Sequence, residues 1–349
     1  MLKNEWIEQG YIDEIPSGTV FEGMESMDKG QCEAVLKAEI RKLCQEKNAV
    51  VLAHYYTTGD IQEVADFIGD SLALARKAAQ TDAKIIVMAG VHFMAETCKL
   101  LSPDKLVLCP DLNAGCSLAD SCRAEDLKRY KEEHPGYKVV SYVNTTAAVK
   151  ALTDVVVTSG NAKQIVDTFP KDEKIIFGPD YNLGSYINAI TGRNMLLWQG
   201  GCHVHERFSV DAIVQLKQEH PQALVLAHPE CKGPVLKVAD VIGSTAVLLK
   251  YVVEHAEGEY IVATEAGILH EMERQCPDTV LYPVPPEMSG EWQSDNEKYG
   301  CHCNECQYMK MNTLLKIYNC LKYEWPTVEV DAETAQEAVK PIQRMLELS

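Results

Sequence analysis

The sequence predicts an α/β protein built from three similar α/β/α modules, with short parallel sheets arranged around a pseudo-threefold axis. Three observations support this prediction. Short, wholly apolar runs alternate with helical patterns, which is typical of strands buried on both faces of a parallel sheet. One local pattern of residues occurs three times at nearly constant spacing. The length of 349 residues allows two or three domains, each with its own core.

The elements follow one another in a regular order. Residues 1–30 show no periodicity, and residues 31–47 have the pattern of an amphipathic helix. Strands are predicted at 49–53, 84–89, 105–109, 138–143, 154–158, 174–177, 195–198, 223–227, 260–263 and 279–284. A polar stretch with Pro and Gly follows at 285–300, and helices are expected at 307–323 and 331–347. The modules should then comprise residues 1–115 with 307–349, residues 116–201, and residues 202–306.

The repeated pattern has three positions. A His or Tyr ends a strand, an Asp follows 12 residues later, and a small hydroxyl residue opens a helix four or five positions after that. The strand-end residues are His54, Tyr142 and His228, which lie 88 and 86 residues apart. The other two positions are held by Asp66, Asp154 and Asp240, and by Ser71, Ser159 and Thr245. Agreement at three positions in three segments is hard to attribute to chance.

A cysteine follows each copy of the pattern. Cys116 and Cys202 stand before expected helices in the first two copies. Cys301, Cys303 and Cys306 crowd the third, and Cys306 fits best because the expected helix begins directly after it. Since ligands bind at the carboxyl ends of strands in such folds, one thiol from each module should approach the axis. Three thiolates suit a [4Fe–4S] cluster with one open iron, which can act as a Lewis acid.

A zinc site is the alternative interpretation of the same thiols. His203 or His302 would then complete a Cys₃His site. Ligands from one short stretch would favour zinc, whereas these cysteines lie about one module apart, which favours the cluster. The remaining cysteines are expected to be small core or packing residues, namely Cys32, Cys44, Cys98, Cys109, Cys122, Cys231, Cys276 and Cys320.

Polar side chains should surround this centre. They are expected to be His54, Tyr56, Tyr142, Asn144, His228 and Glu230. Glu230 is the only carboxylate among these strand ends, and it could act as a general acid or base if burial raises its pKa. The alternative is a carboxylate at a helix N-terminus that faces solvent. The hydroxyl residues Ser71, Ser159 and Thr245 are either N-caps or, if they face the axis, sites for carboxylate or phosphate.

Charge and hydropathy exclude several classes of protein. The net charge of −18 argues against nucleic acid or an anionic membrane as a partner. No apolar run approaches the roughly 20 residues that a membrane span needs. The N-terminal residues have no apolar segment of signal-peptide type, so we expect a cytoplasmic protein with reduced thiols.

Motifs along most of the chain resemble the quinolinate synthase family. They are AHYY at 53–56, GDSL at 69–72, AGVHFMAET at 89–97, YVNT at 142–145, VTS at 157–159, WQGGC at 198–202, HPE at 228–230, GST at 243–245 and CQYMKMN at 306–312. The resemblance covers about residue 33 to the C-terminus. Many separate motifs in the same order make it specific.

This resemblance implies an enzyme that condenses iminosuccinate (iminoaspartate) with dihydroxyacetone phosphate. The products would be quinolinate for NAD synthesis, phosphate and water. It implies one [4Fe–4S] cluster held by Cys116, Cys202 and Cys306, and L-aspartate oxidase as a candidate partner that would supply the unstable imine. Glu230 and Tyr56 match the expected acid–base pair, with His54 and His228 as further catalytic residues. The substrate contacts implied are His54, Tyr56, Ser71, Tyr142, Val143, Asn144, Ser159, His228, Pro229, Glu230 and Thr245.

Two other classes remain open at this point. An aconitase-like hydro-lyase would also use a [4Fe–4S] cluster with an open iron, but it would have no imine substrate. A non-enzymatic zinc or iron sensor would bind metal through the same cysteines.

Overall fold

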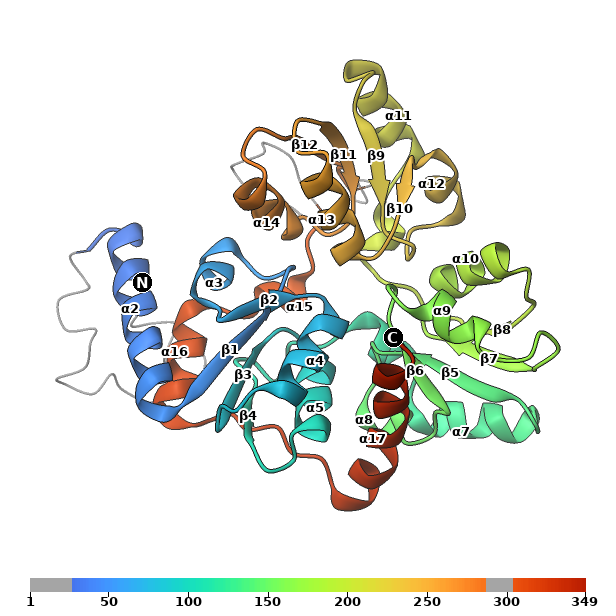
Figure 1. The fold of residues 1–349 in the computed structure, drawn as a ribbon, viewed down its shortest axis with the longest axis horizontal. Coiled ribbons are helices and arrows are strands. Elements are labelled where there is room, and N and C mark those ends of the chain that lie inside the picture. The colour runs from blue at the N-terminus through green and yellow to red at the C-terminus, as the bar shows by residue number, and fades with distance from the viewer. Residues whose placement is uncertain (1–26, 287–303) are drawn as a thin grey trace.

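The computed structural model of this chain describes residues 27–286 and 304–349. Within them the strands form three four-stranded sheets, and every pairing between neighbouring strands is parallel. All three sheets have the same order, with the second strand at one edge, followed by the first, third and fourth. Figure 1 shows these sheets and their helices around a common centre. The predicted fold class is therefore confirmed, and we refer to the three units as the first, second and third modules.

Each module follows the same sequence of elements, in which helices precede and connect the four strands. The first module contains α2 (Lys29–Lys47), β1 (Ala49–His54), α3 (Gly59–Val64), β2 (Phe67–Gly69), α4 (Ser71–Gln80), β3 (Ile85–Ala89), α5 (His92–Leu101) and β4 (Leu106–Leu108). The second contains α6 (Ser117–Ser121), α7 (Ala124–Glu133), β5 (Lys138–Tyr142), α8 (Ala147–Lys150), β6 (Val155–Val157), α9 (Ala162–Asp167), β7 (Ile175–Gly178), α10 (Tyr181–Thr191) and β8 (Leu196–Leu197).

The third module repeats this order, and three helices close the chain. Its elements are the short 3₁₀ helix η2 (His205–Arg207), α11 (Val210–Glu219), β9 (Leu224–Ala227), α12 (Gly233–Val238), β10 (Val241–Ile242), α13 (Thr245–Glu254), β11 (Glu259–Ala263), α14 (Ile268–Gln275) and β12 (Val280–Pro283). The last helices are α15 (Gln307–Lys310), α16 (Leu314–Tyr323) and α17 (Ala332–Glu347).

The ten predicted strands are all present, and no strand end differs from its prediction by more than one residue. Two strands that the sequence did not predict are β2 and β10, which are only three and two residues long. Such short runs carry no periodicity of their own, and they are strands because β1 and β9 pair with them. The polar stretch predicted at 285–300 lies largely outside the described residues.

The repeated Asp fixes the start of each sheet. The Val51 N–H donates to Asp66 Oδ2 at 2.7 Å, and the Asp66 N–H donates back to the Val51 carbonyl at 2.9 Å. Asp154 makes the same two bonds with Val139, at 2.8 and 3.0 Å, and Asp240 makes them with Val225, at 2.8 Å each. The Asp repeat is thus a structural clamp at the amino-terminal edge of the sheets, away from the strand ends that carry His54, Tyr142 and His228.

Two expectations about helices were wrong. The single helix expected at 307–323 is broken into α15 and α16, because Thr313 caps α16 and the Asn312 amide turns away to donate to the Gly90 carbonyl at 2.8 Å. Ser159 does not open a helix, since α9 begins only at Ala162 and the Asn161 side chain instead accepts from the Thr158 N–H at 2.6 Å.

The core confirms that the sheets are buried on both faces. On β9 and β11, Leu226 and Val262 pack into one apolar cluster, and the alternate residues Val225 and Ile261 pack into another. The first two modules share a continuous cluster, which also includes Ile342 of α17. Figure 1 shows α17 beside α5 and α8, against which it packs. The module boundaries proposed from the sequence stay a prediction.

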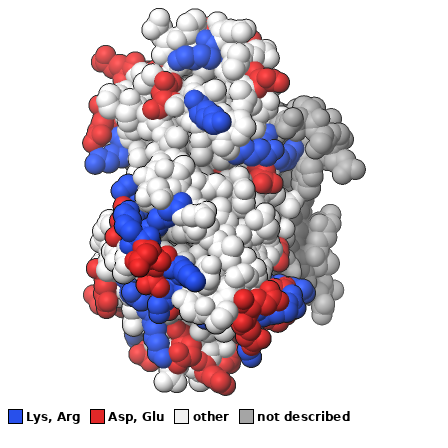
Figure 2. Space-filling model, turned by 90° about the vertical axis from the view of Figure 1, so that its right-hand side faces the viewer, with Lys and Arg blue, Asp and Glu red and all other residues white. Residues whose placement is uncertain are grey.

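The surface carries charges of both signs. Figure 2 shows Lys and Arg side chains interspersed with Asp and Glu on one face, without a continuous basic field. Among the helices of the described residues, none is both long enough and apolar enough to cross a membrane.

Candidate metal centre and substrate pocket

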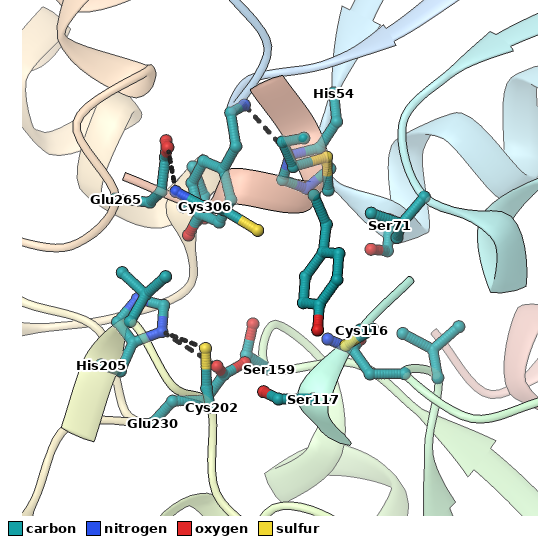
Figure 3. A pocket seen from close by; sticks show the side chains of 18 of the residues that line it. His54, Ser71, Cys116, Ser117, Ser159, Cys202, His205, Glu230, Glu265 and Cys306 are labelled. Carbon is teal, nitrogen blue, oxygen red and sulfur yellow. Dashed lines mark hydrogen bonds and ion pairs between the residues drawn. The ribbon is translucent and has the colours of Figure 1, made fainter. Parts of the chain in front are cut away.

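A cavity of about 710 Å³, counted with its open mouth, lies where the three modules meet. Its walls include residues of all three modules and of α15, and Cys116, Cys202 and Cys306 are among them. Figure 3 shows the three sulfur atoms turned toward the same space. Of the residues proposed as substrate contacts, only Pro229 does not line the cavity; it lies between His228 and Glu230, which do.

The three cysteines are half-buried and form no disulfide among the described residues. Burial raises the pKa of Cys116 to about 11 and that of Cys306 to about 12, and it raises the pKa of Cys202 well above its usual value. The thiols are therefore protonated at neutral pH in the metal-free protein, and a metal would displace these protons on binding. Cys301 and Cys303, the weaker candidates, lie outside the described residues.

The turns that carry the cysteines are tied to one another. The His203 N–H donates to the Ser117 hydroxyl at 3.1 Å, which joins the turn of Cys202 to that of Cys116. The Tyr308 ring meets the His203 ring edge-on, with centroids 5.5 Å apart, next to Cys306. Three thiols on mutually fixed turns, facing one cavity, fit a metal cluster that takes one ligand from the turn after each sheet.

Buried carboxylates hold two of the three cysteines. In each module, the pairing between the first and third strands ends at one residue of the third strand. The position two residues further on is equivalent in the three modules, and it is held by Val91, Asp180 and Glu265. Asp180 accepts the Cys202 N–H at 3.0 Å, and Glu265 accepts the Cys306 N–H at 2.9 Å, while both side chains are fully buried. Burial raises the pKa of both carboxyls. The apolar Val91 provides no such bond in the first module.

Glu230 lies at the centre of the polar wall and is only 3% exposed, so the solvent-facing alternative is wrong. Burial by itself raises the pKa of Glu230, but electrostatic interaction with His228 and His205 and hydrogen bonds from His205 and Tyr142 outweigh burial and lower it below its usual value. The condition stated for Glu230, a pKa raised by burial, is therefore not met. Glu230 is an ionised carboxylate, ready to accept a proton.

The two strand-end histidines adopt the same local geometry. His54 Nδ1 accepts the Tyr56 N–H at 3.1 Å, and His228 Nδ1 accepts the Glu230 N–H at 3.3 Å. Each ring must then carry its proton on Nε2, and His228 donates it to the Ser159 hydroxyl at 3.2 Å. Burial lowers the pKa of both histidines to about 3, so both are neutral hydrogen-bond donors near pH 7.

Tyr142 is buried and Tyr56 is half-buried, and both line the cavity. Tyr142 donates to Glu230 Oε1, and the Tyr56 hydroxyl lies 2.8 Å from Thr245 Oγ1 and 3.1 Å from Thr264 Oγ1. Burial, reinforced by the charge of Glu230, raises the pKa of both phenols well above the usual value. Lys310 fixes Tyr56 from outside by donating to its carbonyl at 2.8 Å.

The hydroxyl residues of the repeat face the cavity and do not cap helices. Ser71 and Thr245 are the first residues of α4 and α13, and the caps are the residues before them, Asp70 and Ser244. A residue at the first helical position keeps its side chain free while the nearby N–H groups point outward. Ser71, Thr245 and Ser159 all line the cavity, together with Val143 and Asn144.

A buried lysine supports the turn that carries Asn144. Lys150 is fully buried and donates to the Val143 carbonyl at 2.9 Å and to the Thr145 carbonyl. Its ammonium lies over the Phe93 ring, 5.4 Å from the centroid. Burial lowers its pKa to about 8.

Sequence reasoning missed several of these residues. Asp180, Glu265, Thr264 and Lys150 were not considered, and His205 was not among the proposed site residues. A sequence signal existed for Asp180 and Glu265. Both are acidic residues at the same position after the third strand, in two of the three modules. Thr264 and Lys150 gave no signal, since their roles come from contacts with distant residues.

Fold and site together define a class: a three-module α/β protein with one thiol after the fourth strand of each sheet, at a central pocket. Comparison with known proteins supplies the family. Residues 38–347 match the family model described as quinolinate synthetase A protein. The chain is 51% identical to the quinolinate synthase of Microcystis aeruginosa over 310 residues, which are 89% of this chain and 94% of that protein. It is 51% identical to the quinolinate synthase of a Nostoc species over 331 residues, 95% and 99% of the two chains.

A third relative, the quinolinate synthase of Trichodesmium erythraeum, is 53% identical over 310 residues, 89% of this chain and 93% of that protein. The chain belongs to the quinolinate synthase family. The resemblance noted in the sequence is thereby confirmed.

Proposed function

We propose that the protein condenses iminosuccinate with dihydroxyacetone phosphate to form quinolinate, a transferase reaction in NAD biosynthesis that takes place in the cytoplasm. One observation carries this proposal: three thiols, one after each of the three sheets, face the same cavity as a buried, ionised Glu230 and the Tyr56 phenol. Family membership gives the reaction its name, and the chemistry of the pocket supplies the roles of the residues.

Cys116, Cys202 and Cys306 are the residues that would hold a [4Fe–4S] cluster. When bound, such a cluster with one iron free of protein ligands supplies a Lewis acid for the hydroxyl group that leaves late in the reaction. His205 lies 3.3 Å from Cys202 Sγ through its Nδ1. A hydrogen bond to this sulfur is one of the means by which a protein tunes a bound cluster.

Proton transfer falls to the residues opposite the thiols. The imine must become an enamine, the ketose phosphate must isomerise, and water must be lost, and each step moves a proton. We assign Glu230 as the base because its carboxylate is ionised and lines the cavity, where Tyr142 and His205 hold its two oxygens in place. We assign Tyr56 as the matching acid because its phenol is protonated and lines the same cavity.

The pocket binds anions without salt bridges. The proposed substrates carry carboxylates and a phosphate, yet none of the described residues that line the cavity is Lys or Arg. The N–H groups at the starts of α4 and α13 and the hydroxyls of Ser71 and Thr245 provide the donors instead. The Nε2–H groups of His54 and His228, which follow from the geometry of their turns, add two more.

The test is turnover by anaerobically purified protein. Iminosuccinate formed from oxaloacetate and ammonia, mixed with dihydroxyacetone phosphate, should give quinolinate, detected by chromatography. Omitting either substrate should abolish the product, which distinguishes this reaction from that of a hydro-lyase. An inactive protein that contains four irons and labile sulfide would contradict the proposed reaction but not the cluster. A third assay would add L-aspartate oxidase as the source of the imine.

A further inference from the structure

A second set of metal-binding atoms exists within the pocket, and it includes only one of the three cysteines. His205 Nδ1 lies 3.3 Å from Cys202 Sγ and 3.0 Å from Glu230 Oε2. The three donor atoms are all within 4.8 Å of one another, and the His205 and Glu230 side chains are almost fully buried. Figure 3 shows these three side chains converging on one side of the cavity.

These donors form the kind of ligand set that zinc takes. Thiolate, imidazole and carboxylate are all zinc ligands, and catalytic zinc sites combine three protein ligands with a water molecule. A tetrahedral zinc with bonds of about 2.0–2.3 Å keeps its ligand atoms about 3.3–3.6 Å apart. Two of the distances between the donors, 3.3 and 3.0 Å, are close to that range, and the third is no more than 4.8 Å, so a metal would require only a small movement of side chains.

The surrounding residues hold each donor from behind. Metal-binding histidines almost always bond through their other ring nitrogen to a fixed group. His205 Nε2 lies 3.0 Å from the buried Thr264 hydroxyl, which leaves Nδ1 directed at the other two donors. Tyr142 holds the second oxygen of Glu230, and Asp180 holds the backbone of Cys202. The three ligands are therefore oriented before any metal arrives.

We propose that, in protein that lacks its cluster, Cys202, His205 and Glu230 bind one zinc-like divalent cation. The Cys202 thiol loses its proton to solvent, the His205 ring proton shifts from Nδ1 to Nε2, where the Thr264 hydroxyl can accept it, and no oxidation or reduction takes place. Cys202 also belongs to the proposed cluster site, so the two metal centres exclude each other. A bound zinc would occupy Glu230 as well, and it would therefore block both cluster assembly and catalysis. This inference goes beyond the proposed reaction and does not depend on it.

The probe is Co²⁺, whose absorption reports thiolate ligation and tetrahedral geometry directly. Cluster-free protein, prepared anaerobically with a chelator, is titrated with Co²⁺ and then with Zn²⁺ as competitor. We expect a sulfur-to-cobalt charge-transfer band and intense visible bands that saturate and that Zn²⁺ removes. The Cys202→Ala variant should lose the part of this signal that comes from the proposed site.

Two further variants separate this site from a site made of three cysteines. His205→Gln should lose the signal, whereas Cys116→Ala should keep it, because Cys116 is not a ligand here. Thr264→Val should weaken Co²⁺ binding roughly 10–100-fold, as expected for a residue that orients a ligand. Circular dichroism and reconstitution of the cluster in His205→Gln verify that this variant is folded.

The opposite pattern would overturn the proposal. Loss of the signal in Cys116→Ala to the same extent as in Cys202→Ala would mean that the metal sits on the cysteines alone. Unchanged binding in His205→Gln would have the same meaning. Failure of Co²⁺ binding would leave the cluster and the proposed reaction untouched, because those are measured by iron, sulfide and quinolinate.

Discussion

The two edges of the three sheets differ in how far the modules resemble one another. At the amino-terminal edge, Asp66, Asp154 and Asp240 make the same pair of bonds to the first strand in every module. At the carboxyl-terminal edge, the equivalent residues are His, Tyr and His at the end of the first strand, and Val, Asp and Glu after the third. The edge that maintains the fold is symmetric, and the edge that forms the pocket is not.

The difference follows from what each edge contacts. An amino-terminal clamp acts within its own module, so the same residue serves three times. The carboxyl-terminal residues share one cavity, where identical side chains would place identical charges beside one another. Glu230 already contributes a buried negative charge. This charge adds to the effect of burial and raises the pKa of Tyr56, Tyr142 and Asp180 further. Because the residues at this edge differ between the modules, each wall of the cavity carries different chemical groups.

The largest expected effect comes from removing one thiol of the asymmetric edge. Cys116→Ala, Cys202→Ala and Cys306→Ala should each lose the visible absorbance of the cluster and quinolinate formation, because the cluster needs all three ligands. Cys301→Ala and Cys303→Ala should keep the absorbance. The buried Cys231, which does not line the cavity, gives a matched control as Cys231→Ala. Absorbance retained in Cys306→Ala would overturn the third ligand assignment.

A smaller loss is expected when the base is neutralised and the thiols are kept. Glu230→Gln should lower quinolinate formation roughly 10²–10⁴-fold, the usual contribution of general acid–base catalysis, with the cluster absorbance intact. Rates are measured under substrate saturation, and Glu219→Gln on the exposed end of α11 serves as the control. Activity within a factor of a few of the wild type would remove Glu230 from proton transfer.

The buried histidines should make stability depend on pH. His54 and His228 have a pKa of about 3 in the folded protein, whereas an unfolded His has about 6.5. Between these values only the unfolded chain binds the protons, so stability is complete above pH 6.5 and falls as the pH decreases toward 3. The slope is about 1.4 kcal/mol per pH unit for each histidine.

Urea unfolding of cluster-free protein at pH 7 and pH 5 measures this slope. His228→Gln should show a shallower decrease than the wild type, while His255→Gln, at an exposed position, should not. If the free energy of unfolding changed equally with pH in all three proteins, His228 would be protonated in the folded state over this pH range, and its pKa would not be lowered.

The smallest effects are expected at the symmetric edge. Asp66→Ala, Asp154→Ala and Asp240→Ala should each lower the free energy of unfolding by about 1–2 kcal/mol, since each removes one charged hydrogen bond at a partly exposed site. The matching Asn variants retain an oxygen that can accept this bond, and they should recover most of the loss. Quinolinate formation by the folded protein should be unchanged. A loss of activity without loss of stability would place that Asp in the site.

Most of the fold was predictable because its signals are local. The strands β1, β5 and β9 are apolar runs bounded by polar residues, and the spacing of His54, Tyr142 and His228 revealed the triplication. Strands β2 and β10 were not predictable, because two or three residues become a strand only beside a partner. The break at Asn312 was also missed, since its cause is a bond to the carbonyl of Gly90, more than 200 residues away in the chain.

The sequence by itself determined the repeat, the family, and which side chains stand at the ends of the strands, because these depend on the order and spacing of residues. Only the tertiary structure decided how the side chains act on one another. In the folded chain, hydrogen bonds from Tyr142 and His205 keep Glu230 ionised. Asp180 and Glu265 accept the backbone N–H groups of Cys202 and Cys306. Cys202, His205 and Glu230 lie next to one another. Burial and electrostatic interaction depend on distance in space, and no pattern along a chain specifies that distance.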